Sequence, residues 1–156
     1  MIDEFEIMAQ EAEDFSEMIY TLNFAPAELI VAAINNKYDV IVAESIDYII
    51  LNKRVKEFIQ DLIDIAGKPI TYLIAGRLRL CAALCNSDEL RVLLSQVDIV
   101  RDSYYEVWQD AALFLETGQS SYYEELLNTI HCQDKTISSL ANTLIELLRS
   151  ESLDHE

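Results

Sequence analysis

The sequence predicts an all-α fold: a single domain, built as a helical bundle or as stacked α-hairpins, with seven or eight helices. Hydrophobic residues make up 51% of the 156 positions and recur at helical spacing along most of the chain. Only three glycines and two prolines are available for turns. This scarcity argues against sandwiches, barrels and glycine-rich nucleotide loops. A chain of this length needs neither a disulfide nor a metal to stabilise its core.

The first predicted helix covers residues 2–22 and is strongly amphipathic. Its apolar side chains recur every three or four positions, and acids occupy the opposite face. Asp3 followed by Glu6 suits a capped helix start, where acids also complement the helix dipole. Four acids of this helix are candidate contacts for a protein partner: Glu6, Glu13, Asp14 and Glu17.

Three helical segments are predicted between this helix and Gly67. Residues 26–36 form a helix that starts at a proline and ends at two asparagines. Residues 40–51 form the next apolar segment, and helical spacing continues without interruption over residues 51–65. Gly67 ends this helix, and Pro69 restarts the chain.

The middle of the chain predicts the central helix of the fold. Residues 70–85 are apolar on almost every side, as expected of a buried helix. A further helix opens at Asp88, and its apolar stripe allows one long helix to residue 116. A break near Asp102 is the alternative, since Ser103 and Glu106 have capping-box spacing.

Two helices are predicted at the C-terminal end. Gly118 separates them from the preceding unit, and Ser121 with Glu124 forms a second capping-box pattern, which predicts a helix to about His131. Asp134 is placed to cap the last helix.

All of these helices belong to one predicted domain, residues 1–149, and residues 150–156 are expected to form a frayed acidic tail. Short connections make sequential helices antiparallel. The stretch LRLCAALCNSDELRVLL, residues 78–94, resembles one unit of a HEAT or armadillo repeat, and the chain holds no second copy of it.

The charge is strongly acidic and unevenly distributed. The formal net charge is −17, with −10 on residues 1–52, +2 on residues 53–101 and −9 on residues 102–156. This balance argues against nucleic-acid binding. It keeps the protein soluble, and it also produces a field that would steer a basic partner.

The sequence offers no motif for catalysis or for a metal. Neither His131 nor His155 follows a glutamate by three positions, as a di-iron helix bundle requires. Cys81, Cys85 and Cys132 could supply zinc ligands, but their pattern favours core packing. We therefore expect no enzyme, no metal and no cofactor. The odd cysteine count favours a reducing compartment, and the absence of a signal peptide or a membrane span favours the cytoplasm.

Two arginines lie within apolar stripes, where a guanidinium needs a partner. For Arg77 and Arg101 we expect structural pairing, with Glu44, Asp47 or Asp98 as candidate carboxylates. The alternative is that both arginines line a groove that holds an acidic group of a partner or ligand.

Aromatic residues cluster between positions 104 and 123, where they form either hairpin packing or a contact surface. Adjacent helical residues cannot both face the core. We therefore expect partial exposure of at least one tyrosine in each Tyr-Tyr pair. The candidate partner contacts here are Tyr104, Tyr105, Trp108, Tyr122 and Tyr123.

These observations favour a non-enzymatic protein-interaction module of the adaptor, chaperone, immunity or inhibitor type. It would present an acidic surface to a protein partner, which the charge suggests is basic. A binder or enzyme for a small anionic ligand that uses Arg77 and Arg101 is the first alternative. A nucleic-acid mimic is a minor one. The sequence leaves the oligomeric state open.

Overall fold

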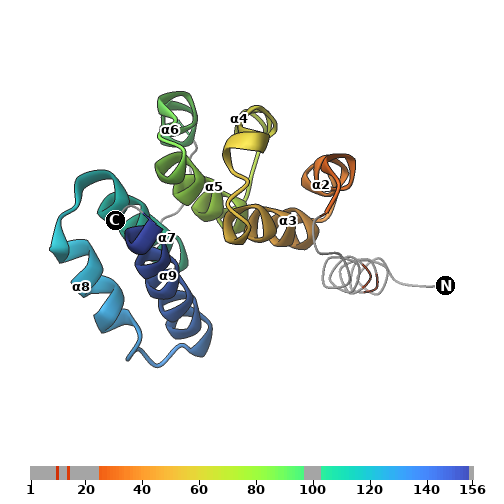
Figure 1. Cartoon of the computed structure of the whole chain (residues 1–156). Coiled ribbons are helices and arrows are strands. Elements are labelled where there is room, and N and C mark those ends of the chain that lie inside the picture. The colour runs from red at the N-terminus through yellow and green to blue at the C-terminus, as the bar shows by residue number, and fades with distance from the viewer. Residues whose placement is uncertain (1–9, 11–13, 15–24, 97–102, 155–156) are drawn as a thin grey trace.

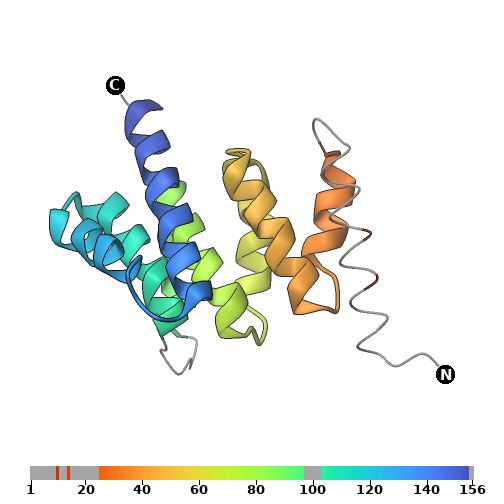
Figure 2. The same cartoon turned by 90° about the horizontal axis from the view of Figure 1, so that it is seen from below.

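The computed structural model describes residues 25–96 and 103–154, together with Gln10 and Asp14, and side chains as far as residue 151. Every regular element in these ranges is a helix (Figures 1 and 2), which confirms the all-α prediction. The predicted first helix lies outside the described residues except for those two positions. No helix in the described ranges is long and apolar enough to cross a membrane.

Six helices pack in two rows of three. One row contains α2 (Ala27–Ile34), α4 (Ile59–Ala66) and α6 (Asp88–Ser95); the other contains α3 (Asp39–Leu51), α5 (Tyr72–Leu84) and α7 (Ser103–Thr117). Helices within a row contact one another in chain order, and Figure 1 shows the first row above the second. This arrangement corresponds to stacked α-hairpins rather than a closed bundle.

Two further helices pack against the end of this stack. Helix α8 (Ser120–Thr129) and helix α9 (Lys135–Asp154) contact α7 and each other (Figure 1). The eight α-helices of the described ranges agree with the predicted number. Helix α9 continues to Asp154 and so includes most of the segment that we assigned to the tail.

Local signals define three helix ends, and two of them, Gly118 and Asp134, are predicted from the sequence and confirmed. The side chain of Ser87 accepts a hydrogen bond from the Leu90 amide at 3.1 Å and caps α6. Gly118 adopts a positive φ of 71° directly after α7, a conformation that favours glycine. Asp134 Oδ1 accepts hydrogen bonds from the amides of Thr136 and Ile137 at 3.0 and 3.2 Å, and so caps α9.

The predicted helical continuity over residues 51–65 is wrong. Helix α3 ends at Leu51, and a 3-10 turn over Lys56–Phe58 precedes α4. Lys53 has a φ of 57°, which breaks the helix, and Arg54 then points inward with 5% exposure. Its Nη1 donates to the carbonyl oxygen of Ala25 at 2.7 Å, a contact far away in sequence that overrides the local helical pattern.

Two other boundaries are settled by the structure. Helix α6 ends at Ser95 and helix α7 begins at Ser103, so the segment that could have formed one helix forms two. The Ser121 capping box is wrong: α8 starts at Ser120, Gln119 occupies the N-cap position, and no side chain caps it.

Helix α5 is central, as its apolar sequence predicts. It packs on α3, α4, α6 and α7, and Leu78, Leu80 and Cys81 are fully buried. Its glycine allows the closest approach: a Cβ built on Gly76 would lie 2.5 Å from Cδ1 of Trp108. The absence of a side chain at this position therefore lets the Trp108 ring pack directly on the α5 backbone.

Candidate functional site

Arg77 and Asp47 form an ion pair that joins α5 to α3. The guanidinium Nε donates to Asp47 Oδ1 at 2.8 Å, and Nη2 donates to Oδ2 at 3.2 Å, a two-point contact. Nη1 donates to the Leu73 carbonyl oxygen at 2.9 Å and to the Tyr104 hydroxyl at 2.7 Å. The guanidinium carbon also lies 5.0 Å from the ring centroid of Trp108. The structure thus selects Asp47 from the three carboxylates expected from sequence.

Burial and pairing act in opposite directions on the pKa values of this pair. Burial raises the pKa of Asp47 above its usual value, and the hydrogen bonds and charge of Arg77 oppose that increase only in part. Burial acts to lower the pKa of Arg77, but Asp47 and Tyr104 together raise it. Arg77 is therefore charged at neutral pH, and a neighbour within the fold compensates its charge.

A small pocket with a volume of about 220 Å³ opens beside this pair. Four helices contribute to it, with Arg77 of α5 and Trp108 of α7 among the lining residues, next to Asp47 of α3. The other lining residues are Ile50, Leu51, Leu140, Thr143, Leu144 and Leu147. Apart from the ion pair and the Thr143 hydroxyl, the wall is apolar, so the pocket suits an apolar group.

The aromatic residues predicted as one contact surface divide into two clusters. Tyr105 and Trp108 are buried in the core at 6% and 4% exposure. In this structure they therefore do not reach the surface where we expected them to contact a partner. Tyr104 is half-buried, as its position beside Tyr105 predicts, and contacts the rings of Tyr72 and Trp108 edge-on. This first cluster belongs to the Arg77 site.

The second cluster lies at the other end of α7. Tyr122 and Tyr123 are half-buried, and the ring of Tyr123 packs against that of Phe114, with 5.4 Å between the ring centroids. Arg149 Nε donates to the Tyr123 hydroxyl at 3.1 Å. Ten residues of helix separate Tyr104 from Phe114, about 15 Å along the axis, so the two clusters do not merge into a single patch.

Some of the predicted site residues lie in segments that the structure does not describe. Glu6, Glu13, Glu17 and Arg101 lie outside the described residues, as does Asp98, one of the expected carboxylates. Asp14 is exposed and accepts a hydrogen bond from Gln10 at 3.0 Å.

Three other arginines form structural pairs that the sequence analysis did not identify. The Glu116 carboxylate of α7 accepts hydrogen bonds from Arg79 Nη2 at 2.6 Å and from Arg91 Nη1 at 2.7 Å. These bonds join α5 and α6 to α7. Arg54 pairs with Glu57 at 2.7 Å, next to its contact with Ala25. Arg91 Nη2 also donates to Asp88 Oδ1 at 2.9 Å. The Arg54–Glu57 and Asp88–Arg91 pairs have the three-position spacing that a sequence can show, whereas the two pairs of Glu116 join residues 25 and 37 positions apart.

The three cysteines lie in different environments within the described ranges. Burial raises the pKa of both the Cys81 and Cys85 thiols, which disfavours the reactive thiolate. Cys132 is exposed, and its thiol donates to the carbonyl oxygen of Asp134 at 3.4 Å. Within residues 25–96 and 103–151, no group of three His, Cys, Asp or Glu side chains is placed to share a metal ion.

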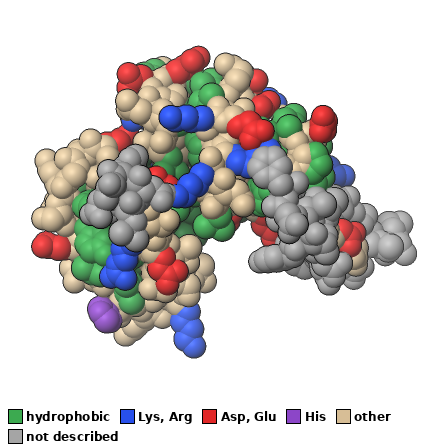
Figure 3. Space-filling view, in the orientation of Figure 1, with side chains coloured by type: hydrophobic (Ala, Val, Ile, Leu, Met, Phe, Trp, Pro, Cys, Tyr) green, Lys and Arg blue, Asp and Glu red, His purple; other side chains and the backbone are tan. Residues whose placement is uncertain are grey.

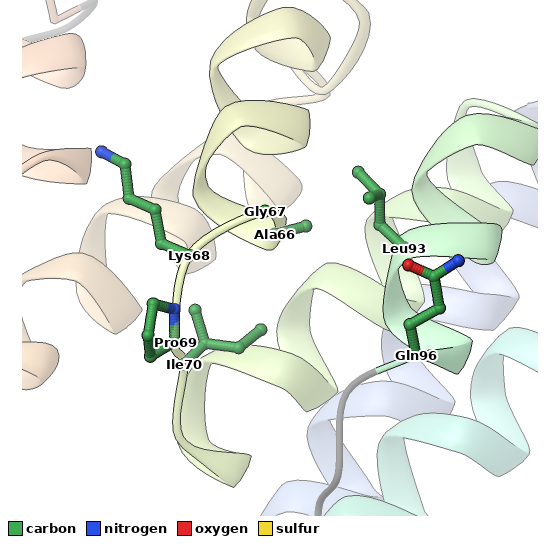
Figure 4. Close-up of a pocket in the computed structure, with 7 residues that line it drawn as sticks. All are labelled: Ala66, Gly67, Lys68, Pro69, Ile70, Leu93 and Gln96. Atoms are coloured by element: carbon green, nitrogen blue, oxygen red, sulfur yellow. The ribbon is translucent and has the colours of Figure 1, made fainter.

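A second pocket, of about 460 Å³, lies between the α4–α5 connection and α6. Figure 4 shows Leu93 of α6 and Gln96, which directly follows α6, on one side and residues 66–70 on the other. Gln96 immediately precedes residues 97–102, which the structure does not describe. The wall holds one charged residue, Lys68, and no acid, so it offers no pair of groups for acid–base chemistry.

Acidic side chains are spread over the face drawn in Figure 3 and do not gather in one patch, and hydrophobic side chains show between them. Comparison of the chain with protein-family models, curated proteins and solved structures finds no match. The segment that resembles a HEAT or armadillo unit does form a helix, a turn and a helix, from the second half of α5 through α6.

Proposed function

We propose that the protein is a non-enzymatic interaction module that binds a basic protein partner through an acidic surface. The observation that carries the proposal is the internal pairing of its arginines. The side chains of Arg54, Arg77, Arg79 and Arg91 have exposures of 5%, 11%, 13% and 25%, and each forms an ion pair within the fold. Their positive charge therefore contributes little to the field outside the molecule.

This pairing changes how the near-neutral middle of the chain is interpreted. Once these four arginines and the four acids that bind them are set aside, seven bases face 24 acids in the whole chain. Within residues 53–101 the same step leaves four bases and four acids, so the middle of the chain carries no excess of positive charge outside its ion pairs, and the excess of acids lies on the two ends. A field of one sign raises the encounter rate with an oppositely charged partner.

Exposed apolar side chains are the second feature that supports a protein interface. Among the described residues, five large hydrophobic side chains are at least 37% exposed: Val40, Leu51, Tyr72, Val92 and Leu127. Scattered exposed hydrophobics are normal on a protein surface. Leu51, however, also lines the pocket beside Arg77, which joins an exposed apolar group to a concave site.

The alternative of an anionic ligand held by Arg77 has weaker support. Hydrogen bonds within the fold occupy four of the five guanidinium N–H groups, and Asp47 compensates the charge. An anion would have to displace Asp47 and leave a partly buried carboxylate without its partner. We also propose a reducing compartment such as the cytoplasm, because all three cysteines are free thiols.

Affinity capture from native lysate tests this proposal, with washes at low and then high salt. We expect a basic protein that is retained at low salt and released as salt rises. Two variants with equal net charge would locate the surface. One neutralises Glu106, Asp110, Glu124 and Glu125 on α7 and α8; the other neutralises Glu28, Asp39, Asp61 and Asp64 on α2, α3 and α4. No partner at either salt concentration would contradict the proposal.

A further inference from the structure

We infer that the pocket between α3, α5, α7 and α9 binds an aliphatic side chain from a basic segment of the partner protein. This inference rests on the proposed function and adds to it a location and an anchor.

The size and lining of the pocket favour a side chain over a small molecule. Its volume of about 220 Å³ is below the roughly 300–1,000 Å³ typical of small-molecule sites. The wall is formed mainly by leucine and isoleucine side chains of α3 and α9. Such a wall gains free energy by removing an aliphatic group from water, and shallow apolar pockets of this kind accept the anchor residues of protein interfaces.

At the edge of the pocket, an apolar side chain remains uncovered by the described part of the chain. Leu51 is 62% exposed, the highest value among the exposed large hydrophobic side chains there. It lies at the last position of α3 and lines the pocket, whereas the neighbouring Ile50 is 4% exposed. An anchor side chain in the pocket would cover Leu51 and extend the apolar contact between α3 and α9.

Charge complementarity identifies the segment around the anchor as basic. Helix α3 carries no base, and Asp47 is the acid of this helix that lines the pocket. The side chain of Asp47 lines the pocket with 37% exposure, so its carboxylate retains access to water. The one cation that lines the pocket, Arg77, is already paired with that carboxylate.

The second flanking helix has the same sign. Glu151 lies one helical turn after Leu147, on the side of α9 that faces the pocket. Arg149 bonds to Tyr123 on the α8 side instead. A lysine or arginine next to the anchor would therefore meet the water-accessible part of Asp47 on one flank and Glu151 on the other, in a chain with a net charge of −17, whereas an acidic segment would be repelled.

Defined peptides and two matched variants of the full chain test this inference. The peptides are KKGLGKK, its alanine counterpart KKGAGKK and its acidic counterpart EEGLGEE. Thr143→Phe places a ring in the pocket, and Asn142→Phe adds the same ring at the adjacent exposed position that does not line the pocket. Trp108, the only tryptophan of the chain, lines the pocket and reports binding by fluorescence. Circular dichroism checks that both variants are folded.

We expect KKGLGKK to bind about tenfold more tightly than the alanine peptide, because an aliphatic group leaves water. We expect it also to bind more tightly than EEGLGEE. Thr143→Phe should abolish this preference for leucine, and Asn142→Phe should retain it. Equal binding of the leucine and alanine peptides, or unchanged binding by Thr143→Phe, would overturn the inference. If Thr143→Phe instead abolishes self-association in sedimentation velocity, the occupant is a second copy and the inference is wrong.

The captured partner separates this inference from the proposed function. A basic partner that binds Thr143→Phe as tightly as it binds the wild-type protein would refute the pocket and leave the acidic surface in place. Failure to capture any partner would refute the proposed function itself. Binding reduced at least tenfold by Thr143→Phe, but not by Asn142→Phe, would support both.

Discussion

Replacing Arg77 with methionine tests whether the ion pair at the centre of the site is structural. Methionine keeps much of the apolar contact with Trp108 and removes all four hydrogen bonds of the guanidinium. The loss falls on Asp47, the Leu73 carbonyl and the Tyr104 hydroxyl, which come from three helices. The variant should therefore weaken the packing between α3, α5 and α7.

The expected loss of unfolding free energy follows from burial. Removing one partner from a fully buried ion pair costs about 3–5 kcal/mol. The Asp47 side chain is 37% exposed, so water can replace part of the hydrogen bonding that its carboxylate loses with Arg77. We therefore expect Arg77→Met to lose about 2 kcal/mol at pH 7, which lowers the melting temperature of a protein of this size by about 4–8 °C.

The dependence of this loss on pH has a defined sign. Burial already raises the pKa of Asp47, and Arg77 opposes that increase. Without Arg77 the pKa of Asp47 rises further, so the carboxyl protonates more readily and needs no cation as the pH falls. The difference in stability between wild type and Arg77→Met should therefore be smaller at pH 4 than at pH 7.

Urea unfolding, followed by Trp108 fluorescence and by circular dichroism, measures both effects. The double variant Asp47→Leu with Arg77→Met is the matched control, because it removes the carboxylate that the single variant leaves unpaired. We expect the double variant to be more stable than Arg77→Met alone. The reasoning is refuted if Arg77→Met unfolds within about 0.5 kcal/mol of wild type, or if the double variant is less stable than the single one.

Three further predictions concern other parts of the fold. Gly76→Ala would place a Cβ 2.5 Å from the Trp108 ring, so we expect a loss of about 1–2 kcal/mol in urea unfolding and altered tryptophan fluorescence, despite the higher helix propensity of alanine. Burial and two nearby glutamates raise the pKa of Asp110 to about 6 from 3.8; its ionisation therefore opposes folding above pH 6 and not below pH 4, and Asp110→Asn should stabilise the protein by about 1 kcal/mol at pH 7 and show little effect at pH 4. Asp134→Ala removes the α9 cap and should lower the melting temperature by about 2–4 °C, in proportion to the roughly 1 kcal/mol that a cap contributes.

Local patterns in the sequence located most of the helices. The cap at Asp134 and the stop at Gly118 depend on nearby residues, and the structure contains both. The break after Leu51 could not be predicted in the same way. It depends on Arg54 reaching the carbonyl oxygen of Ala25, 29 positions earlier, and helical spacing contains no information about that contact.

The candidate site was predictable only in part. The position of Arg77 within an apolar stripe indicated that it needs a carboxylate, and Asp47 was among the candidates. The pocket was not predictable, because Leu51 and Thr143 approach each other only when α9 packs back on the stack. Trp108 was expected at the surface, but it is buried, because Gly76 has no side chain to keep its ring away from α5.

The association rate of the captured partner, measured as a function of salt, tests the central claim most directly. If the acidic surface steers a basic partner, the association rate constant should fall at least about tenfold between 50 and 500 mM salt, while the dissociation rate constant changes less. An association rate constant that is independent of salt, or that rises with it, would contradict the proposed acidic binding surface.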